Sequence, residues 1–204
     1  MTTGAWSTDT APDPLEALSW PLTTERLTLR RVTPEDAEAM WGYRRLPEVS
    51  HWLTFMPRDL DDWRDLLTSP QRLATTLVAE RDGRIVGDFY LRVEDAWAQR
   101  EAGDQARGVQ AELGWVLDPA FGGRGYATEA CRALLRVCFG ELGLRRVCAA
   151  AFAGNEASWR LMERLGMRRE QYTVRESLHR ELGWVDGVGY ALLADEWARG
   201  AAPA

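Results

Sequence analysis

A glycine-rich segment, FGGRGYATEA over residues 121–130, lies between a strand-like run and a strongly periodic helical stretch. A turn at such a junction directs several backbone N–H groups into one small volume, at the positive end of the helix dipole. Glycine has no Cβ atom, so an anion can approach the main chain closely. The segment therefore predicts a binding site for a phosphate or pyrophosphate, and with it a nucleotide-containing cofactor.

The composition limits the class of protein. The chain has 204 residues, of which 46% are hydrophobic, so it can build one substantial core and one domain is expected. The formal net charge of −6 argues against general nucleic-acid binding, which relies on many lysine and arginine contacts to phosphates. No apolar run is long enough to cross a membrane, and residues 1–18 lack the apolar stretch of a secretory signal. We expect no nucleic-acid partner, no membrane contact and a cytoplasmic protein.

The cysteines do not indicate a metal site. Cys131, Cys138 and Cys148 lack metal-ligand spacing, and we expect no bound metal. Cys131 and Cys138 are seven residues apart and so share a helix face, where they are expected to be small buried apolar residues. The odd number of cysteines fits a reducing compartment.

The hydrophobic patterns predict an α+β domain. Alternating patterns and apolar runs predict strands over residues 26–32, 73–80, 84–93, 110–118, 146–151 and 184–193, with a further one near 167–174. Helical spacing predicts a helix that begins at Thr33, and helices over residues 59–67, 126–142 and 155–165. Residues 1–20 and 199–204 are expected to be disordered tails around a single domain over residues 21–198.

This order of elements, with a glycine turn after the fourth strand, resembles the GNAT acyltransferase superfamily. Gly122 to Ala127 looks like the pyrophosphate loop of that family, and NEASWRLMERLGM over residues 155–167 is similar to its Asn-x-x-Ser helix. Residues 24–37 resemble the RimJ/RimL-like branch. The resemblance covers residues 24–197 and implies a mixed, mostly antiparallel, splayed sheet flanked by helices. One departure is Gly122, where the family usually has Gln or Arg; the backbone donors stay, so we expect binding to survive.

The resemblance implies acetyl-CoA as the donor and a primary amine, from a small molecule or a protein N-terminus, as the acceptor. Between the splayed strands, the backbone of Trp115, Val116 and Leu117 would pair with the pantetheine arm like an added strand. Asn155 would contact the same arm. The amides of Gly123 to Thr128 would hold the pyrophosphate, and Arg124 could add a charge. The cofactor loop as a whole comprises Gly122, Gly123, Arg124, Gly125, Tyr126, Ala127 and Thr128.

The attacking amine must be neutral, and amines with a pKa of about 7.7–8.0 (α-amine) or about 10.4 (lysine) need a base to remove a proton. Glu112 is the first candidate for a catalytic base, because it is in phase with Gly114 and Val116 and would face the acceptor cleft; the alternative is an exposed strand residue. Its rivals are Glu170, Glu176 and His179, each expected to be a solvated residue.

Ser158 matches the serine that serves some members of the family as a catalytic acid toward the leaving thiolate, and it would also lie at the cofactor. It would equally suit the third position of a helix whose N-cap is Asn155. Among ten tryptophans, Trp41, Trp63, Trp115 and Trp159 fall at core positions. Trp52 would either pack or line the acceptor cleft.

Two other functions stay open. A dinucleotide-binding protein would explain the turn, but GRGYAT over residues 123–128 lacks the third glycine and the chain lacks βαβ repetition. A non-catalytic acyl-CoA-binding sensor or partner domain would have the same fold and cofactor site. A homodimer is compatible with the sequence. The acidic net charge favours a cationic acceptor.

Overall fold

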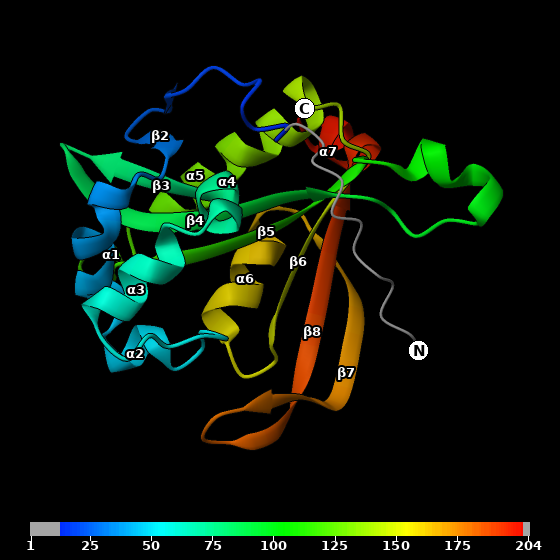
Figure 1. Cartoon of the computed structure of the whole chain (residues 1–204). Helices are drawn as coiled ribbons and strands as arrows, with labels where there is room; N and C mark the ends of the chain where they lie inside the picture. Colours follow the sequence, from blue (N-terminus) through cyan, green and yellow to red (C-terminus); the bar gives the residue numbers. More distant parts are fainter. Residues whose placement is uncertain (1–12, 202–204) are drawn as a thin grey trace.

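In the computed structural model, which describes residues 13–201, one eight-stranded sheet has the order β1-β2-β3-β4-β5-β6-β8-β7 (Figure 1). The strands are β1 (Leu22–Thr23), β2 (Thr28–Arg31), β3 (Thr76–Arg81), β4 (Arg84–Glu94), β5 (Gln110–Leu117), β6 (Arg146–Phe152), β7 (Arg168–His179) and β8 (Gly183–Leu193). Neighbouring strands are antiparallel except β5 and β6, which are parallel. The expected mixed, mostly antiparallel sheet is therefore confirmed.

Helices cover both faces of this sheet. They are α1 (Ala37–Arg44), α2 (Pro47–Ser50), α3 (Leu60–Leu67), α4 (Pro70–Thr75), α5 (Tyr126–Arg136), α6 (Glu156–Arg164) and α7 (Ala194–Ala201). The alternation of side chains along a strand divides the core. In β3, Leu77 and Ala79 pack in the same cluster as α5 and α6, whereas Val78 packs with α1 and α3.

Several expected core residues are buried. Trp63 is 2% exposed. The other three tryptophans that were expected in the core are half-buried and pack against the core clusters. Cys131 and Cys138 are fully buried, and burial raises the pKa of the Cys138 thiol to about 12. These thiols are packing groups, because the thiolate needed for nucleophilic or metal chemistry is strongly disfavoured.

Two boundaries differ from the sequence expectation. The strand expected from Leu73 begins at Thr76, because Ser69 and Pro70 start the short helix α4 with proline in its first turn. The helix expected over 126–142 is α-helical only to Arg136 and continues as one π-helical turn over Val137–Glu141.

The expected tails are shorter than predicted within the described residues. Leu15 is 1% exposed in the main core, and the Trp20 indole N–H donates to the Leu15 carbonyl over 2.8 Å, so residues 13–20 pack on the domain. At the other end, α7 continues to Ala201. The rest of both expected tails, residues 1–12 and 202–204, lies outside the described residues.

Strands β5 and β6 separate partway along their length. Their pairing includes Gln110 with Arg146 and ends at Glu112 with Cys148. Beyond this point β5 pairs only with β4, and β6 pairs only with β8. Figure 1 shows the two strands diverging with α6 beside the gap. One edge of β5, from Leu113 onward, is therefore left without a neighbouring strand.

Candidate functional site

The glycine-rich loop presents a row of free backbone donors. Gly123 and Gly125 have φ values of +72° and +79°, in the left-handed region that favours glycine. Within the described chain, no acceptor meets the N–H groups of residues 123–128, and the first backbone bond of α5 runs from the Glu129 N–H to the Gly125 carbonyl (3.0 Å). These donors at a helix N-terminus suit a phosphate group.

Gly122 differs from the other loop residues. Its N–H already donates to the Pro119 carbonyl over 2.9 Å, in the short 3₁₀ turn Pro119–Phe121 that precedes the loop. Gly122 is therefore part of the expected loop, but its N–H is not available to a ligand. Tyr126 is 2% exposed, so its side chain belongs to the core and only its backbone reaches the loop surface.

Arg26 and Glu129 hold the loop in place from a distance in sequence. The Arg26 guanidinium lies 2.6 Å from the Glu129 carboxylate, donates to the Arg124 carbonyl (2.9 Å), and stacks over the Tyr126 ring at 4.8 Å. The Thr24 hydroxyl donates to the same carboxylate over 2.6 Å. Burial works to raise the pKa of Glu129, but these hydrogen bonds outweigh it and the net pKa is lowered. The carboxylate therefore stays ionised and fixes the first turn of α5.

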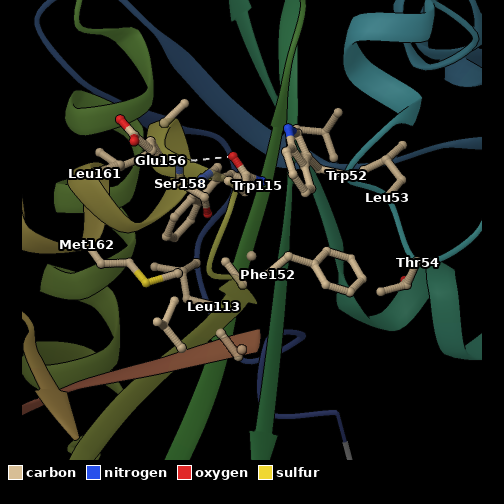
Figure 2. A pocket seen from close by; sticks show the side chains of 18 of the residues that line it. Trp52, Leu53, Thr54, Leu113, Trp115, Phe152, Glu156, Ser158, Leu161 and Met162 are labelled. Atoms are coloured by element: carbon tan, nitrogen blue, oxygen red, sulfur yellow. Dashed lines mark hydrogen bonds between the residues drawn. The ribbon is translucent and has the colours of Figure 1, made fainter. Parts of the chain in front are cut away.

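A cleft of about 840 Å³ lies in the gap between the diverging strands β5 and β6. Its lining includes a set of residues expected at the cofactor, namely Trp115, Val116, Leu117, Ala127, Asn155 and Ser158. Figure 2 shows Ser158, Leu161 and Met162 of α6 on one side, and Trp52, Leu53 and Thr54 on the other, with β5 between them. The rest of the loop, which includes Arg124 and Thr128, is outside the lining but adjoins it through Ala127.

The start of α6 confirms the capping role of Asn155. Its side-chain oxygen accepts the Ser158 N–H at 3.3 Å. This bond uses the backbone of Ser158, so its hydroxyl is left without a partner among residues 13–201 while it lines the cleft. The two readings of Ser158 are therefore compatible, and its role as an acid stays a prediction.

Glu112 lies at the point where the strands part. It belongs to the last β5–β6 pair, faces the same side as Val116, and has a 38% exposed side chain. Its carboxylate accepts a hydrogen bond from the Arg92 guanidinium at 3.1 Å. Glu112 lines the cleft and also a second cavity that adjoins it. Glu112 therefore borders both spaces, and its expected place at the acceptor stays a prediction.

Two rival bases have structural roles instead. Glu170 forms ion pairs with Arg146 (2.9 Å) and Arg168 (2.6 Å). His179 is 3% exposed, so it is not the solvated residue expected; its Nδ1 accepts the N–H groups of residues 181 and 182, which leaves the proton on Nε2, facing the His51 carbonyl at 2.7 Å. Both ring nitrogens of His179 are thus occupied.

Glu176 and Trp52 line the cleft. Glu176 is exposed, and its carboxylate has no cation at ion-pair distance in the described part of the chain. The Trp52 ring meets those of His51 (4.5 Å between centroids), His179 (5.5 Å) and Phe152 (6.1 Å). Trp52 therefore forms a packed wall of the cleft, which combines the two interpretations of this residue.

The second cavity has a volume of about 770 Å³ and lies between the β4–β5 face and helices α1, α3 and α4. It shares Glu112, Trp115 and Val116 with the first cleft, so the two spaces adjoin at β5. Its other polar residues include Arg44, Arg72, Asp88, Tyr90 and Arg92. Sequence patterns gave no signal for this cavity, because its residues come from five separate helices and strands and from the segment around Thr54.

The described residues form neither a metal-binding cluster nor a membrane-spanning helix. No cluster of three or more histidine, cysteine, aspartate or glutamate side chains there is arranged to hold a metal ion. None of the helices over residues 13–201 has the length and apolar character needed to cross a membrane. The sheet has one parallel pair rather than βαβ repeats, which argues against the dinucleotide-binding alternative.

Comparisons with known proteins agree with this geometry. The model of the acetyltransferase (GNAT) domain matches residues 26–168, and the chain belongs to this family. The chain is 30% identical over 179 residues to "Uncharacterized N-acetyltransferase YnaD" of Bacillus subtilis, covering 86% of this chain and 98% of that one. It is 31% identical over 177 residues to "Putative ribosomal N-acetyltransferase YdaF" of the same organism, covering 85% and 94%. The latter name agrees with the resemblance to the RimJ/RimL-like branch.

Among solved structures, a GNAT-family acetyltransferase from Bacillus anthracis superimposes with a TM-score of 0.73. The two sequences are 28% identical, and the match covers 86% of this chain and 99% of that chain. The family and the fold that the motifs indicated are thus confirmed.

Proposed function

We propose that this protein is an N-acetyltransferase that moves an acetyl group from acetyl-CoA to a primary amine while both are bound. One observation carries the proposal: β5 parts from β6 after Glu112, and the open gap leads to the free N–H groups of residues 123–128. An extended amide-containing arm fits a strand edge that lacks a neighbour, and a pyrophosphate fits the donors at the start of α5.

The roles of the binding residues follow from this arrangement. The backbone of Trp115, Val116 and Leu117 would pair with the pantetheine amides, and Asn155 would border the same arm. The pyrophosphate would lie on the N–H groups of Gly123, Arg124, Gly125, Tyr126, Ala127 and Thr128. Gly122 would shape the turn without donating to the phosphate, since its N–H is already used.

The chemistry requires two proton movements. The amine nitrogen would attack the thioester carbonyl carbon, forming the C–N bond, and the C–S bond would then break. We assign the amine proton to Glu112, directly or through a water molecule, because this carboxylate borders both cavities. The Arg92 ion pair would orient the Glu112 carboxylate. Ser158 would protonate the leaving thiolate and recover a proton from solvent.

The proposal is tested by incubating the protein with acetyl-CoA and a panel of primary amines. The panel contains alkylamines, amino acids, polyamines and peptides with a free N-terminus. We expect release of free CoA thiol together with a mass increase of the amine by one acetyl group. Binding of acetyl-CoA without thiol release for any amine would favour the sensor alternative instead.

Two further properties belong to the same proposal. A cytoplasmic location is supported by the free state of Cys131, Cys138 and Cys148, which suits a reducing compartment. A homodimer is supported by exposed apolar side chains on the edge strand β7 and its hairpin, among them Val174 and Trp184. Sedimentation of the purified protein at several concentrations measures the oligomeric state directly.

A further inference from the structure

The second cavity is built on a polar face of the sheet. Tyr90 and Arg92 of β4 lie opposite Gly114 and Glu112 of β5, so their side chains share one face. The helical wall adds Arg44 from α1 and Arg72 from α4. Three guanidinium groups therefore border one space.

Two of these arginines are already paired. The Arg44 guanidinium lies 2.7 Å from the Asp88 carboxylate and stacks over the Trp63 ring at 4.6 Å. The Arg92 guanidinium lies 3.1 Å from Glu112. For Arg72, the described residues provide no carboxylate within ion-pair distance. Arg92 also pairs with Glu94 at 2.9 Å, so Arg72 is the arginine of this cavity that has no ion-pair partner among the described residues.

The surroundings of Arg72 favour an incoming anion. Its side chain is half-buried, and this burial lowers its pKa, as does the charge of Arg44; the charge of Asp88 only partly compensates. A guanidinium in such a place is stabilised by a counter-ion, and its planar fork matches the two oxygens of a carboxylate.

Tyr90 provides a second donor in the same cavity. Its hydroxyl makes no hydrogen bond to any residue of the described chain, although it lines the cavity with Arg72. Burial raises the pKa of Tyr90, so the hydroxyl keeps its proton and can donate it in a hydrogen bond. A guanidinium and a phenol on one cavity wall form a suitable pair of donors for an acidic group.

We propose that the acceptor amine carries a carboxylate, which Arg72 and Tyr90 bind while the amine lies at Glu112. This inference rests on the proposed acetyltransferase function and names its substrate class. Glu112 borders both the cleft and the second cavity, so an acceptor anchored at Arg72 can extend its amine to the acetyl donor. The local charge at Arg72 reverses the expectation of a cationic acceptor that the net charge of −6 suggested.

The test compares matched acceptors that differ in charge. The small-molecule pairs are β-alanine with β-alaninamide and 4-aminobutanoate with 4-aminobutanamide, and the peptide pair has Asp or Asn after a free N-terminal Ala. We expect kcat/KM for thiol release to be about 10- to 100-fold higher for the acidic member of at least one pair. A carboxylate raises the pKa of a neighbouring amine, so protonation works against this preference rather than for it. A preference within the small-molecule pairs would indicate a free amino acid as the acceptor, and a preference within the peptide pair would indicate an acidic protein N-terminus.

Variants assign the preference to the cavity. We expect Arg72→Gln to raise KM for the acidic acceptor about 10- to 100-fold, with kcat and the kinetics of the amide nearly unchanged. Tyr90→Phe is expected to have a smaller effect in the same direction. Arg136→Gln removes an equal charge from the exposed face of α5. It is expected to leave kcat and KM unchanged for both the acidic acceptor and its amide. No preference in any pair, or the same preference in Arg72→Gln, would overturn the inference.

A second measurement keeps the inference testable if Arg72→Gln does not fold. The variant Arg72→Lys retains the charge but loses the planar guanidinium fork, and should weaken the binding of the acidic acceptor but not of its amide. Binding of N-acetyl-β-alanine and its amide, followed by the fluorescence of the tryptophans that include Trp115, needs no turnover. Equal binding of the two would contradict the inference. Amine acetylation without a carboxylate preference would refute this inference only, whereas absence of acetyl-CoA binding would refute the proposed function.

Discussion

Replacing Gly125 by valine tests the proposed role of the loop most sharply. Gly125 has a φ of +79°, and an added Cβ would lie 3.5 Å from the Arg26 guanidinium that anchors the loop. A β-branched residue in the left-handed region is destabilised by about 1–2 kcal/mol, so the backbone is expected to leave this conformation. The N–H groups on either side of Gly125 would then no longer converge on one anion.

The size of the effect follows from the bonds that are lost. A hydrogen bond to a charged group contributes about 1.5–3 kcal/mol. Losing two of the loop donors therefore weakens binding by about 3 kcal/mol or more, which corresponds to an increase in the Kd for acetyl-CoA of about 100-fold. Calorimetric titration with acetyl-CoA measures this change, and circular dichroism measures whether the variant is folded.

A matched variant separates binding from strain. Gly143 also has a positive φ, +62°, has no atoms near an added Cβ, and does not line the cleft. We expect Gly143→Val to lose a similar amount of stability and to keep its affinity for acetyl-CoA. A folded Gly125→Val variant with wild-type affinity would refute the assignment of the loop, and so would an equal loss of affinity in both variants.

Three further predictions concern the chemistry and the anchoring of the site. Glu112→Gln is expected to lower kcat about 100-fold with unchanged acetyl-CoA affinity, while Glu176→Gln keeps most activity. If steady-state kinetics show the larger loss of kcat for Glu176→Gln, the catalytic base is Glu176 instead. Ser158→Ala is expected to lower kcat at unchanged melting temperature, because the capping bond uses the backbone N–H of Ser158. Asn155→Ala, in contrast, is expected to cost about 1 kcal/mol of stability in thermal unfolding. Full activity of Ser158→Ala would remove Ser158 from the mechanism. Glu129→Gln is expected to destabilise the wild-type fold by about 1–2 kcal/mol near neutral pH. Because the pKa of Glu129 is lowered in the folded state, its contribution is present above the ordinary glutamate pKa of about 4.3 and is lost as the pH falls through the folded value. A stability difference that does not shrink on acidification would contradict the ion pair.

Local signals in the sequence were sufficient for much of the site. Gly123 and Gly125 mark left-handed backbone, and Asn155 marks a helix start, so both features are readable within a few residues. The phase of Glu112 relative to Val116 predicts a shared face of the sheet, and both residues line the second cavity.

The sequence did not show contacts between distant segments. Arg26 and Glu129 are 103 residues apart, and no local pattern connects them. The same applies to Arg72, because the apolar run over residues 73–80 predicts a strand, whereas its first residues belong to helix α4. His179 appeared to be a solvated residue, since its partners become visible only when the chain folds back on residue 51.

The most direct test of the central claim is calorimetric titration of the wild-type protein with acetyl-CoA, with NAD as the comparison ligand. The arrangement of the loop and the parted strands predicts one site per chain with micromolar affinity for acetyl-CoA, and no measurable heat with NAD. Absence of acetyl-CoA binding by folded protein would contradict the assignment of the cleft and, with it, the proposed acetyl transfer.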